Sequence, residues 1–553
     1  MRQLVSFVFV LCVCVCSSGC TCSSPPRSLQ TTPPSSALRT QLGTNLDFLV
    51  DWSTAMPFVD LMRTSRPWFS GTLADWDGGP PIDVDEHGWV RSLAPQQVVR
   101  TLMVWDATAH PAGRYIVLYD GRGELSYFAG ASDRRIENLS GPNRDVLDID
   151  PRRDGAGIGL AILRTDPEDP IRNIRVLVPG GACSDDETRF CDVVHPCDAP
   201  ASCQPFEQTY ERQVFHPTFL HSLTPYSVIR FMNWADANST ITPTFEERFS
   251  DRTELSDARW APRAPLEVMI DLANRVHAEP WFSLPSRADD DYARRAGALV
   301  REKLDPSLRV WVEYSNEVWN TMFPQAEWAA ERGVALGLAS DRNDAAIRYY
   351  SRRTSELHRA FGEGFGEPSR MVRVYAGQSA SPWLATQVLD FEDAATRADV
   401  FAIAPYFGHT VRSAERAEWA AMSLDAFFER ARRVDLPLMQ EQVGAIAEVV
   451  RERNLSLVGY EGGQHFVGYD DAQDDERILS LFRDATRDPR MEGLYAEYLE
   501  SWRALGGGVL LHHVDCAAGG PHGFWGASEY LGQPLEEAPK RRALLVFGER
   551  TRR

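Results

Sequence analysis

Short apolar runs alternate with amphipathic runs from about residue 206 to the end of this 553-residue chain. The apolar runs have the length and composition of buried strands, and they cover 228–232, 279–284, 309–315, 371–376, 400–404, 455–460 and 509–514. Between them, runs such as 264–277, 290–303 and 345–361 repeat apolar residues at the spacing of one helix face. Strand–helix alternation predicts a parallel sheet wrapped in helices. A further strand at 42–50 brings the number to eight, so we expect an α/β fold, a (β/α)8 TIM barrel.

A different pattern separates the first predicted barrel strand from the second. Short β-rich runs at 114–119, 145–149, 157–163 and 174–178 are punctuated by turn sequences such as Asp120-Gly121. This pattern predicts an antiparallel β-sandwich domain inserted between barrel strands 1 and 2. We therefore divide the chain into a barrel start at 41–90, an inserted β-rich domain at 91–205 and the rest of the barrel at 206–553.

The N-terminal segment has the features of an export signal. Arg2 precedes an apolar stretch, 4–16, that is too short to span a bilayer and has the length of a signal-peptide core. Small residues then precede Cys20, which is a candidate for lipidation, with ordinary cleavage and secretion as the alternative. We expect a signal at 1–22, a flexible linker rich in Pro, Ser and Thr at 23–40, and an exported bacterial protein. We expect either an outer-membrane lipoprotein at the cell surface or a secreted protein. The only expected membrane contact is the lipid anchor of the lipoprotein form.

Charge and cysteine usage narrow the class of protein. The formal net charge of −20 argues against nucleic-acid binding, which needs a basic surface. Four of the ten cysteines lie close together in the sequence, and in an exported chain they predict two disulfide bonds with three possible connectivities. A zinc site is not expected, because none of these cysteines has C-x₂-C spacing. The four are Cys183, Cys191, Cys197 and Cys203.

Polar and aromatic residues gather at the predicted carboxyl ends of the barrel strands. Glu317 follows the run 309–315 within Tyr-Ser-Asn-Glu-Val-Trp-Asn, and Glu461 follows the run 455–460 within Gly-Tyr-Glu-Gly-Gly-Gln-His. Active sites of (β/α)8 barrels lie at these ends, so we expect both carboxyl groups to line one pocket. The other candidates near strand ends are Asp51, Trp52, Arg230, Trp234, Asn316, Trp319, Gln378, Tyr406, His465 and Trp525.

This ordered set resembles retaining (β/α)8 glycoside hydrolases of clan A, the superfamily of cellulases, mannanases and β-glycosidases. The resemblance covers 42–90 and 206–540. That superfamily pairs an Asn-Glu sequence after strand four with a Glu at the end of strand seven, and Asn316-Glu317 and Glu461 occupy these places. A His often found near its strand three is missing from 281–285. Its Arg on strand two, Tyr after strand six and Trp after strand eight are matched by Arg230, Tyr406 and Trp525.

The resemblance implies hydrolysis of a β-linked polysaccharide or oligosaccharide with retention. Glu317 is then the general acid/base, and Glu461 is the nucleophile that forms a covalent glycosyl-enzyme. Arg230 and Tyr406 are expected to hold Glu461 in its ionised form, and Asn316 to hydrogen-bond the sugar 2-hydroxyl. We expect no metal, no cofactor and a monomer. The remaining candidates for substrate contact are Trp525, Trp319, Trp234, Trp52, Gln378, His465 and Asp51.

Some alternatives stay open at this point. Glu313 is an alternative catalytic carboxyl group on the same predicted strand as Glu317, but it is expected to pair inside the barrel with Arg230 or Arg373. Glu441 is an alternative for the nucleophile position, but it begins a predicted helix. Two other functions use the same scaffold. The first is a surface carbohydrate-binding lipoprotein that does not cleave its ligand, and the second is a transglycosylase that uses the same two glutamates with a sugar acceptor in place of water.

Overall fold

Eight parallel strands form a closed barrel, in which each strand pairs with its neighbours around the ring. The computed structural model describes residues 40–552 apart from 106–108, 152–156, 200–201 and 239–247, so the predicted signal, Cys20 and the linker up to residue 39 lie outside the described residues. The barrel confirms the predicted fold. In ring order its strands are β1 (Leu42–Asn45), β14 (Val228–Arg230), β15 (Glu279–Leu284), β16 (Val310–Tyr314), β17 (Met371–Ala376), β18 (Val400–Ile403), β20 (Ser456–Gly459) and β22 (Leu510–His512).

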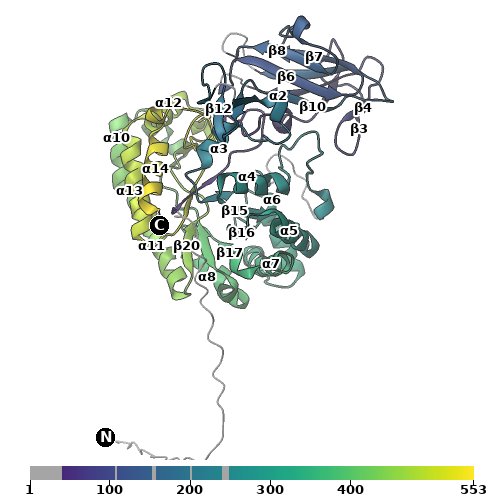
Figure 1. Ribbon diagram of the computed structural model, residues 1–553. Helices are drawn as coiled ribbons and strands as arrows, with labels where there is room; N and C mark the ends of the chain where they lie inside the picture. Colours follow the sequence, from purple (N-terminus) through teal and green to yellow (C-terminus); the bar gives the residue numbers. More distant parts are fainter. Residues whose placement is uncertain (1–39, 106–108, 152–156, 200–201, 239–247, 553) are drawn as a thin grey trace, which may run out of the picture. The chain divides into compact units, whose positions relative to one another are not determined.

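Amphipathic helices surround the barrel strands (Figure 1). The Asp289 carboxylate caps α5, and the Asp341 carboxylate caps α7, which ends at Gly366 in the left-handed conformation. Within the described residues, no helix is long and apolar enough to cross a bilayer. The helices are α2 (Phe206–Thr209), α3 (Pro217–Leu223), α4 (Leu266–Val276), α5 (Asp290–Lys303), α6 (Pro324–Ala335), α7 (Arg342–Phe365), α8 (Pro382–Asp390), α9 (Arg416–Ala420), α10 (Leu424–Arg430), α11 (Leu436–Glu452), α12 (Glu476–Arg487), α13 (Arg490–Ala504) and α14 (Pro539–Thr551).

Side chains from the strands fill the barrel interior. The indoles of Trp281 and Trp311 stack with ring centroids 5.1 Å apart. Each indole Nε1 donates to a buried carboxylate, Trp281 to Glu313 and Trp311 to Glu279. Around this pair pack valine and alanine side chains from β17, β18 and β20. The interior is therefore closed below the carboxyl ends of the strands, and polar side chains above this layer are held against a rigid floor.

Antiparallel sheets occupy the chain between β1 and β14, and two of them share one apolar core. In Figure 1, β6, β7, β8 and β10 lie together in this region. The four-stranded sheet is β2 (Phe69–Gly71), β5 (Val98–Val104), β9 (Ile158–Thr165) and β7 (Gly123–Ala129), and the three-stranded sheet is β10 (Arg172–Leu177), β6 (Gly113–Asp120) and β8 (Arg144–Ile149). A smaller antiparallel pair in this region is β3 (Asp83–Val84) with β4 (Val90–Ser92). In the barrel part of the chain, β19 (Thr410–Val411) and β21 (Val467–Gly468) form a short parallel pair.

The sandwich takes in more of the chain than the sequence pattern indicated. Strand β2 pairs with β5, and Leu61 and Met62 belong to the sandwich core. The antiparallel part therefore begins before residue 91, where the sequence analysis placed its boundary. The short extended segments between 59 and 90 carry little alternation of apolar and polar residues, and only their pairing with β5 and β4 reveals where they belong.

A third small sheet, β11 (Gly181–Cys183), β12 (Asp186–Cys191) and β13 (Cys203–Pro205), carries the clustered cysteines. Disulfide bonds join Cys183 to Cys197 and Cys191 to Cys203, with Cα atoms 5.8 Å apart in each pair. The predicted disulfide bonds are confirmed, and the structure selects one of the three connectivities. Sulfur atoms of Cys183, Cys191 and Cys197 lie within 4.8 Å of one another, but these sulfurs are bonded in disulfides and are not free thiolate ligands.

Candidate active site

Glu461 follows β20 and is held by two donors, one for each carboxylate oxygen. Arg230, the last residue of β14, is fully buried and donates from Nη1 to Glu461 Oε1 at 2.9 Å. The Tyr406 hydroxyl donates to Glu461 Oε2 at 2.9 Å. An opposite charge and a hydrogen bond both favour the ionised form of a carboxyl group. The pair therefore fixes the orientation of Glu461 and stabilises its negative charge.

Glu317 lies three residues beyond the end of β16, in a strained turn. Ser315 and Glu317 have φ of +58° and +41°, which non-glycine residues rarely adopt. This turn aims the carboxyl group at two donors. The Tyr460 hydroxyl donates to Glu317 Oε1 at 2.6 Å, and Asn320 Nδ2 donates to Oε2 at 2.9 Å. The surrounding hydrogen bonds offset the strain of this turn. The turn places the Glu317 carboxyl group at the carboxyl end of the barrel.

The two glutamates belong to one hydrogen-bonded network. Asn316, beside Glu317, accepts from Arg230 Nη2 at 2.7 Å, and Arg230 also binds Glu461. Tyr460, beside Glu461, donates to Glu317. The Asn316-Glu317 pair after β16 and the Tyr460-Glu461 pair after β20 are therefore connected by hydrogen bonds. The negative charge of Glu461 is close enough to raise the pKa of Glu317.

The two carboxyl groups differ in their electrostatic surroundings. Burial raises the pKa of Glu317, and the negative charge of Glu461 raises it further. Burial also raises the pKa of Glu461, but Arg230 and the Tyr406 hydroxyl oppose that shift by direct hydrogen bonds. These surroundings favour the proton on Glu317 and the negative charge on Glu461.

Glu313 is the structural counter-ion of Arg230. It is buried on β16, and its two oxygens accept from Arg230 Nε and Nη2, from Trp281 Nε1 and from Ser283 Oγ at 2.9–3.1 Å. These four hydrogen bonds tie Glu313 to the barrel interior and support a structural role for it, not a catalytic one. Arg373, the other partner considered from the sequence, pairs with Asp399 at 2.8 Å instead.

An aromatic cluster lies beside Glu461. The ring of Trp525 contacts the rings of Tyr406, His465 and His513, with centroids 5.0–5.8 Å apart. Burial lowers the pKa of His465, and it lowers the pKa of His513 to about 3, so both imidazoles are neutral near pH 7. The structure thus brings three predicted residues, Tyr406, His465 and Trp525, to one wall. Partly exposed, the indole of Trp525 is available to a ligand.

The structure does not bring all the predicted residues to this place. Trp234 is buried among Phe58, Phe219 and Phe231, and its Nε1 donates to a backbone carbonyl. Its expected role in sugar stacking is wrong, because the loop after β14 turns this side chain into the core instead of toward the open end of the barrel.

Two further pairs of candidates make their contacts outside the Arg230 hydrogen-bond network, although Trp319 packs against the apolar cluster that contains Tyr460. Trp319 and Gln378 line a cavity of about 290 Å³ together with the exposed Trp383. Asp51 is buried and pairs with Arg66 at 2.9 Å, so its expected contact with substrate is also wrong, since the carboxylate is already engaged. Trp52, the next residue, is exposed.

Several residues of the network were not among the sequence-based candidates. Tyr460 is the most important, since it binds Glu317 directly. Its position directly before Glu461 could have indicated this role, because two consecutive residues just after a barrel strand can both lie near the carboxyl end of the barrel. Asn45 accepts from Arg230 Nη1 at 3.2 Å, and Asn238 accepts from Asn316 Nδ2 at 2.8 Å. These amides carry no local pattern that marks them.

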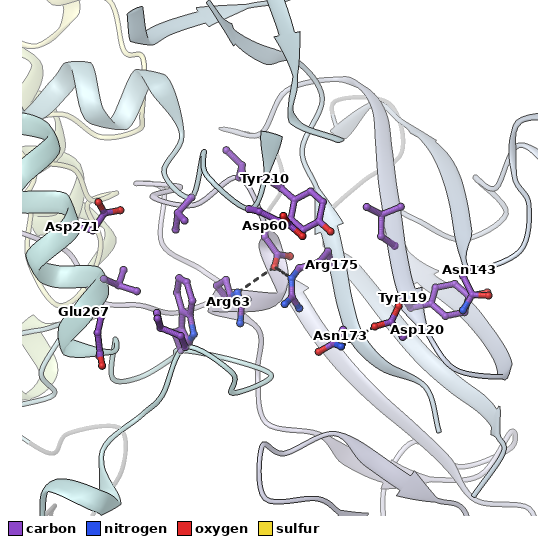
Figure 2. Close-up of a pocket in the computed structure, with 17 residues that line it drawn as sticks. Asp60, Arg63, Tyr119, Asp120, Asn143, Asn173, Arg175, Tyr210, Glu267 and Asp271 are labelled. Carbon is purple, nitrogen blue, oxygen red and sulfur yellow. Dashed lines mark hydrogen bonds and ion pairs between the residues drawn. The ribbon is translucent and has the colours of Figure 1, made fainter. Parts of the chain in front are cut away.

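A larger cavity, of about 770 Å³, lies away from these residues and is lined by the insert and α4 (Figure 2). At its centre the Asp60 carboxylate faces the guanidinium groups of Arg63 and Arg175, at 3.3 and 3.5 Å. Asp60 also accepts from the backbone N–H of Val176 on β10. None of the lining residues contacts Glu317 or Glu461, and the charged centre ties the segment after β1 to the sandwich.

Comparison with known proteins gives only distant likeness. No protein-family model matches the sequence, and no curated protein matches it. Among solved structures, an arabinofuranosidase from Xanthomonas axonopodis pv. citri is 9% identical, with 55% of this chain and 61% of that chain covered and a TM-score of 0.35. A 4-O-alpha-L-rhamnosyl-beta-D-glucuronidase from Fusarium oxysporum 12S is 10% identical, with 62% and 66% covered and a TM-score of 0.38. A beta-glucosidase from Thermotoga maritima is 14% identical, with 60% and 84% covered and a TM-score of 0.34. The chain thus spans less than two thirds of the first two structures.

Proposed function

We propose that this protein is a retaining glycoside hydrolase that acts on a β-linked polysaccharide or oligosaccharide. One observation carries the proposal: two carboxyl groups in one buried network have opposite electrostatic support. Glu461 is bound by a guanidinium and a phenol, and Glu317 faces the charge of Glu461. A retaining mechanism needs one carboxylate as nucleophile and one carboxylic acid as proton donor.

In the first step, Glu461 attacks the anomeric carbon while Glu317 protonates the leaving oxygen. The glycosidic C–O bond breaks, and an ester bond forms between Glu461 and the sugar. Esterification removes the negative charge of Glu461, which had raised the pKa of Glu317. The pKa of Glu317 then falls, so the same residue becomes the base that takes a proton from water in the second step. Arg230 keeps a partner throughout, because it also contacts the Glu313 carboxyl group at 2.9 Å.

Other residues supply substrate contacts in this proposal. Trp525, with His465 beside it, offers a ring face next to Glu461. Asn316 is held between Arg230 and Asn238, which directs its amide near the carboxyl pair for a sugar 2-hydroxyl. The β-linkage rests on the motifs around Asn316-Glu317 and Glu461 that resemble clan A enzymes.

The test compares wild type with Glu461→Gln and Glu317→Gln on aryl β-glycosides and on β-glucan, xylan and mannan. Glu461→Gln should abolish turnover, because an amide cannot form the glycosyl ester. Glu317→Gln should lower kcat/KM by about 10²–10⁴-fold on poor leaving groups and less on activated aryl groups, which depart without a proton. Glu441→Gln is the matched control, since Glu441 is exposed on α11. Full activity in Glu461→Gln, or an inverted anomer as first product, refutes the proposed roles.

The two alternative functions are separated in the same experiment. A carbohydrate-binding lipoprotein would bind one of the polysaccharides without releasing sugars from it. A transglycosylase would lose activity in both glutamine variants but would form longer products when a sugar acceptor is added. Each Glu461 oxygen accepts one hydrogen bond, from Arg230 or from Tyr406, which positions the carboxylate and leaves it lone pairs for attack, and this favours catalysis over binding alone.

Export is part of the proposal. The two disulfide bonds of the insert are typical of proteins in an oxidising compartment, and a polymeric substrate is met outside the cell. Fractionation of cells that express the full chain, with and without Cys20→Ala, tests both localisation and lipidation. Recovery of the wild-type protein in the cytosol contradicts this part of the proposal.

A further inference from the structure

Two tryptophans from separate parts of the chain face one guanidinium on the surface. Trp52, in the loop after β1, is 55% exposed, and Trp105, directly after β5 of the insert, is 58% exposed. The Arg66 guanidinium carbon lies 5.9 Å from the ring centroid of Trp52 and 5.1 Å from that of Trp105. These distances are within the range of cation–π interaction. We call the three side chains the Trp52–Trp105 platform.

Hydrogen bonds hold the platform in a defined arrangement. Arg66 Nε donates to the buried Asp51 carboxylate at 2.9 Å, and the Trp105 backbone N–H donates to the Asp51 carbonyl at 2.8 Å. Arg66 is also fixed to β5, because its backbone N–H donates to Leu102 O at 2.9 Å. Asp51 therefore links the barrel loop, the segment before β2 and the insert. This arrangement is preorganised, so a ligand pays little conformational entropy on binding it.

The platform lies at the same end of the barrel as the candidate active site. Asn45, the last residue of β1, contacts Arg230 at the site, and the platform loop begins directly after it. The loop then packs on the segment after β22, where Thr54 Oγ1 donates to Glu529 O at 2.7 Å and Leu531 N–H donates to Thr54 O at 3.0 Å. That same segment carries Trp525. The loop that carries Trp52 and the segment that carries Trp525 are thus hydrogen-bonded to each other.

We propose that the Trp52–Trp105 platform is a binding site for a segment of a polysaccharide chain that extends away from the cleavage point. Exposed indole faces match the C–H faces of pyranose rings, and the Arg66 guanidinium between them offers donors to ring hydroxyls. Leaving two large apolar rings in water is costly, and a sugar chain removes that cost. The insert would then contribute to substrate choice by selecting polymers over short glycosides. This inference rests on the proposed glycoside hydrolase function.

Trp76 provides a matched control within the insert. It is also 55% exposed, and an arginine, Arg100, lies 4.9 Å from its ring centroid. Its ring packs on Phe69 of β2 and Phe128 of β7, both in the four-stranded sheet. Trp76 thus matches Trp105 in residue type, domain, exposure and cationic neighbour. It packs on the sheet of the insert, whereas Trp105 is hydrogen-bonded to the loop after β1.

The experiment measures kcat/KM on the best polysaccharide and on an aryl glycoside for wild type, Trp52→Ala, Trp105→Ala and Trp76→Ala. The ratio of polymer to aryl glycoside should fall by at least about fivefold in Trp105→Ala and Trp52→Ala, through KM for the polymer. Trp76→Ala should keep the wild-type ratio. Equal losses on both substrates, or an unchanged ratio in Trp105→Ala, overturns the proposal. Circular dichroism and thermal unfolding establish that each variant is folded.

Native gel electrophoresis with embedded polysaccharide tests the platform without turnover. Wild type and Trp76→Ala should be retarded by the same polysaccharide, and Trp105→Ala should run freely. Retardation without hydrolysis by wild type means that the proposed catalytic function is wrong while the platform stands, provided that Trp105→Ala abolishes it. Absence of retardation by every polysaccharide overturns the platform as a glycan-binding site.

Discussion

Tyr406→Phe tests the electrostatic arrangement of the site with the removal of one oxygen atom. The Tyr406 hydroxyl donates to Glu461 Oε2 at 2.9 Å in a buried setting, and this hydrogen bond lowers the pKa of Glu461. A hydrogen bond to a charged group contributes about 1.5–3 kcal/mol. Because 1.36 kcal/mol corresponds to one pKa unit, loss of the bond should raise the pKa of Glu461 by about 1–2 units.

The consequence is visible in the dependence of kcat/KM on pH. Glu461 must be ionised to attack, so its titration sets the acid limb of the profile for the free enzyme. In Tyr406→Phe the acid limb should move to higher pH by about 1–2 units. At a pH well below the wild-type limb, this shift lowers kcat/KM by about 10–100-fold. An aryl glycoside with a good leaving group is the suitable substrate, because its first step depends least on Glu317.

Tyr375→Phe is the control for this measurement. Tyr375 is also a buried tyrosine of the barrel, but its hydroxyl hydrogen-bonds Ser355 on α7, on the outer side of β17. Its profile should keep the wild-type limbs. An acid limb of Tyr406→Phe that stays at the wild-type pH, or a displaced basic limb in its place, refutes the assignment of Glu461 as the ionised partner of Tyr406.

Three further changes have defined outcomes. Tyr460→Phe removes one of the two donors, beside Asn320, that lower the pKa of Glu317, so the basic limb of the same profile should move to higher pH, and an unmoved limb speaks against Glu317 as the acid. Burial raises the pKa of Asp515 to about 7, above its value in the unfolded chain. The contribution of this group to the free energy of unfolding is therefore fully present below about pH 4. It is lost as the pH rises to about 7, at about 1.4 kcal/mol per pH unit. In urea unfolding at pH 5 and pH 7, Asp515→Asn should lose this part of the pH dependence of the free energy of unfolding. If the free energies of unfolding of the variant and wild type differ by the same amount at both pH values, the prediction is contradicted. Replacing Cys183 and Cys197 by Ser should lower the free energy of unfolding by about 2–4 kcal/mol, with a reduced wild type as the comparison, and an unchanged unfolding midpoint excludes a stabilising role for this bond.

Local patterns in the sequence were sufficient to predict the barrel. The apolar run before Glu317 and the run before Glu461 each correspond to a strand of the closed barrel, because burial on both faces leaves a continuous apolar stretch. Capped amphipathic helices follow the same logic, as in α5 and α7. Polar residues that follow predicted strands could be identified as site candidates from sequence, because the carboxyl ends of all parallel strands lie at the same end of a barrel.

Which of those residues meet was decided by three-dimensional contacts. Trp234 and Trp525 both follow a barrel strand, yet one is buried among phenylalanines and the other lies beside Tyr406. Whether such a ring points inward or outward depends on the path of its loop, which residue type and spacing do not encode. The pairing of the four clustered cysteines likewise depends on how β11, β12 and β13 align, so sequence left three possibilities and the structure has one.

The order of strands and helices, the α/β class and the two strand ends that carry Glu317 and Glu461 could be predicted from the amino-acid sequence, because each of these follows from burial along a short stretch of chain. The folded chain was needed to learn that Arg230 and Tyr406 bind one glutamate while Tyr460 binds the other. Hydrogen bonds between residues far apart in the chain depend on strand register and on turn conformation, such as the positive φ of Glu317, to within a few tenths of an ångström. The chemical difference between the two carboxyl groups therefore arises from folding, since both are ordinary glutamates in the sequence.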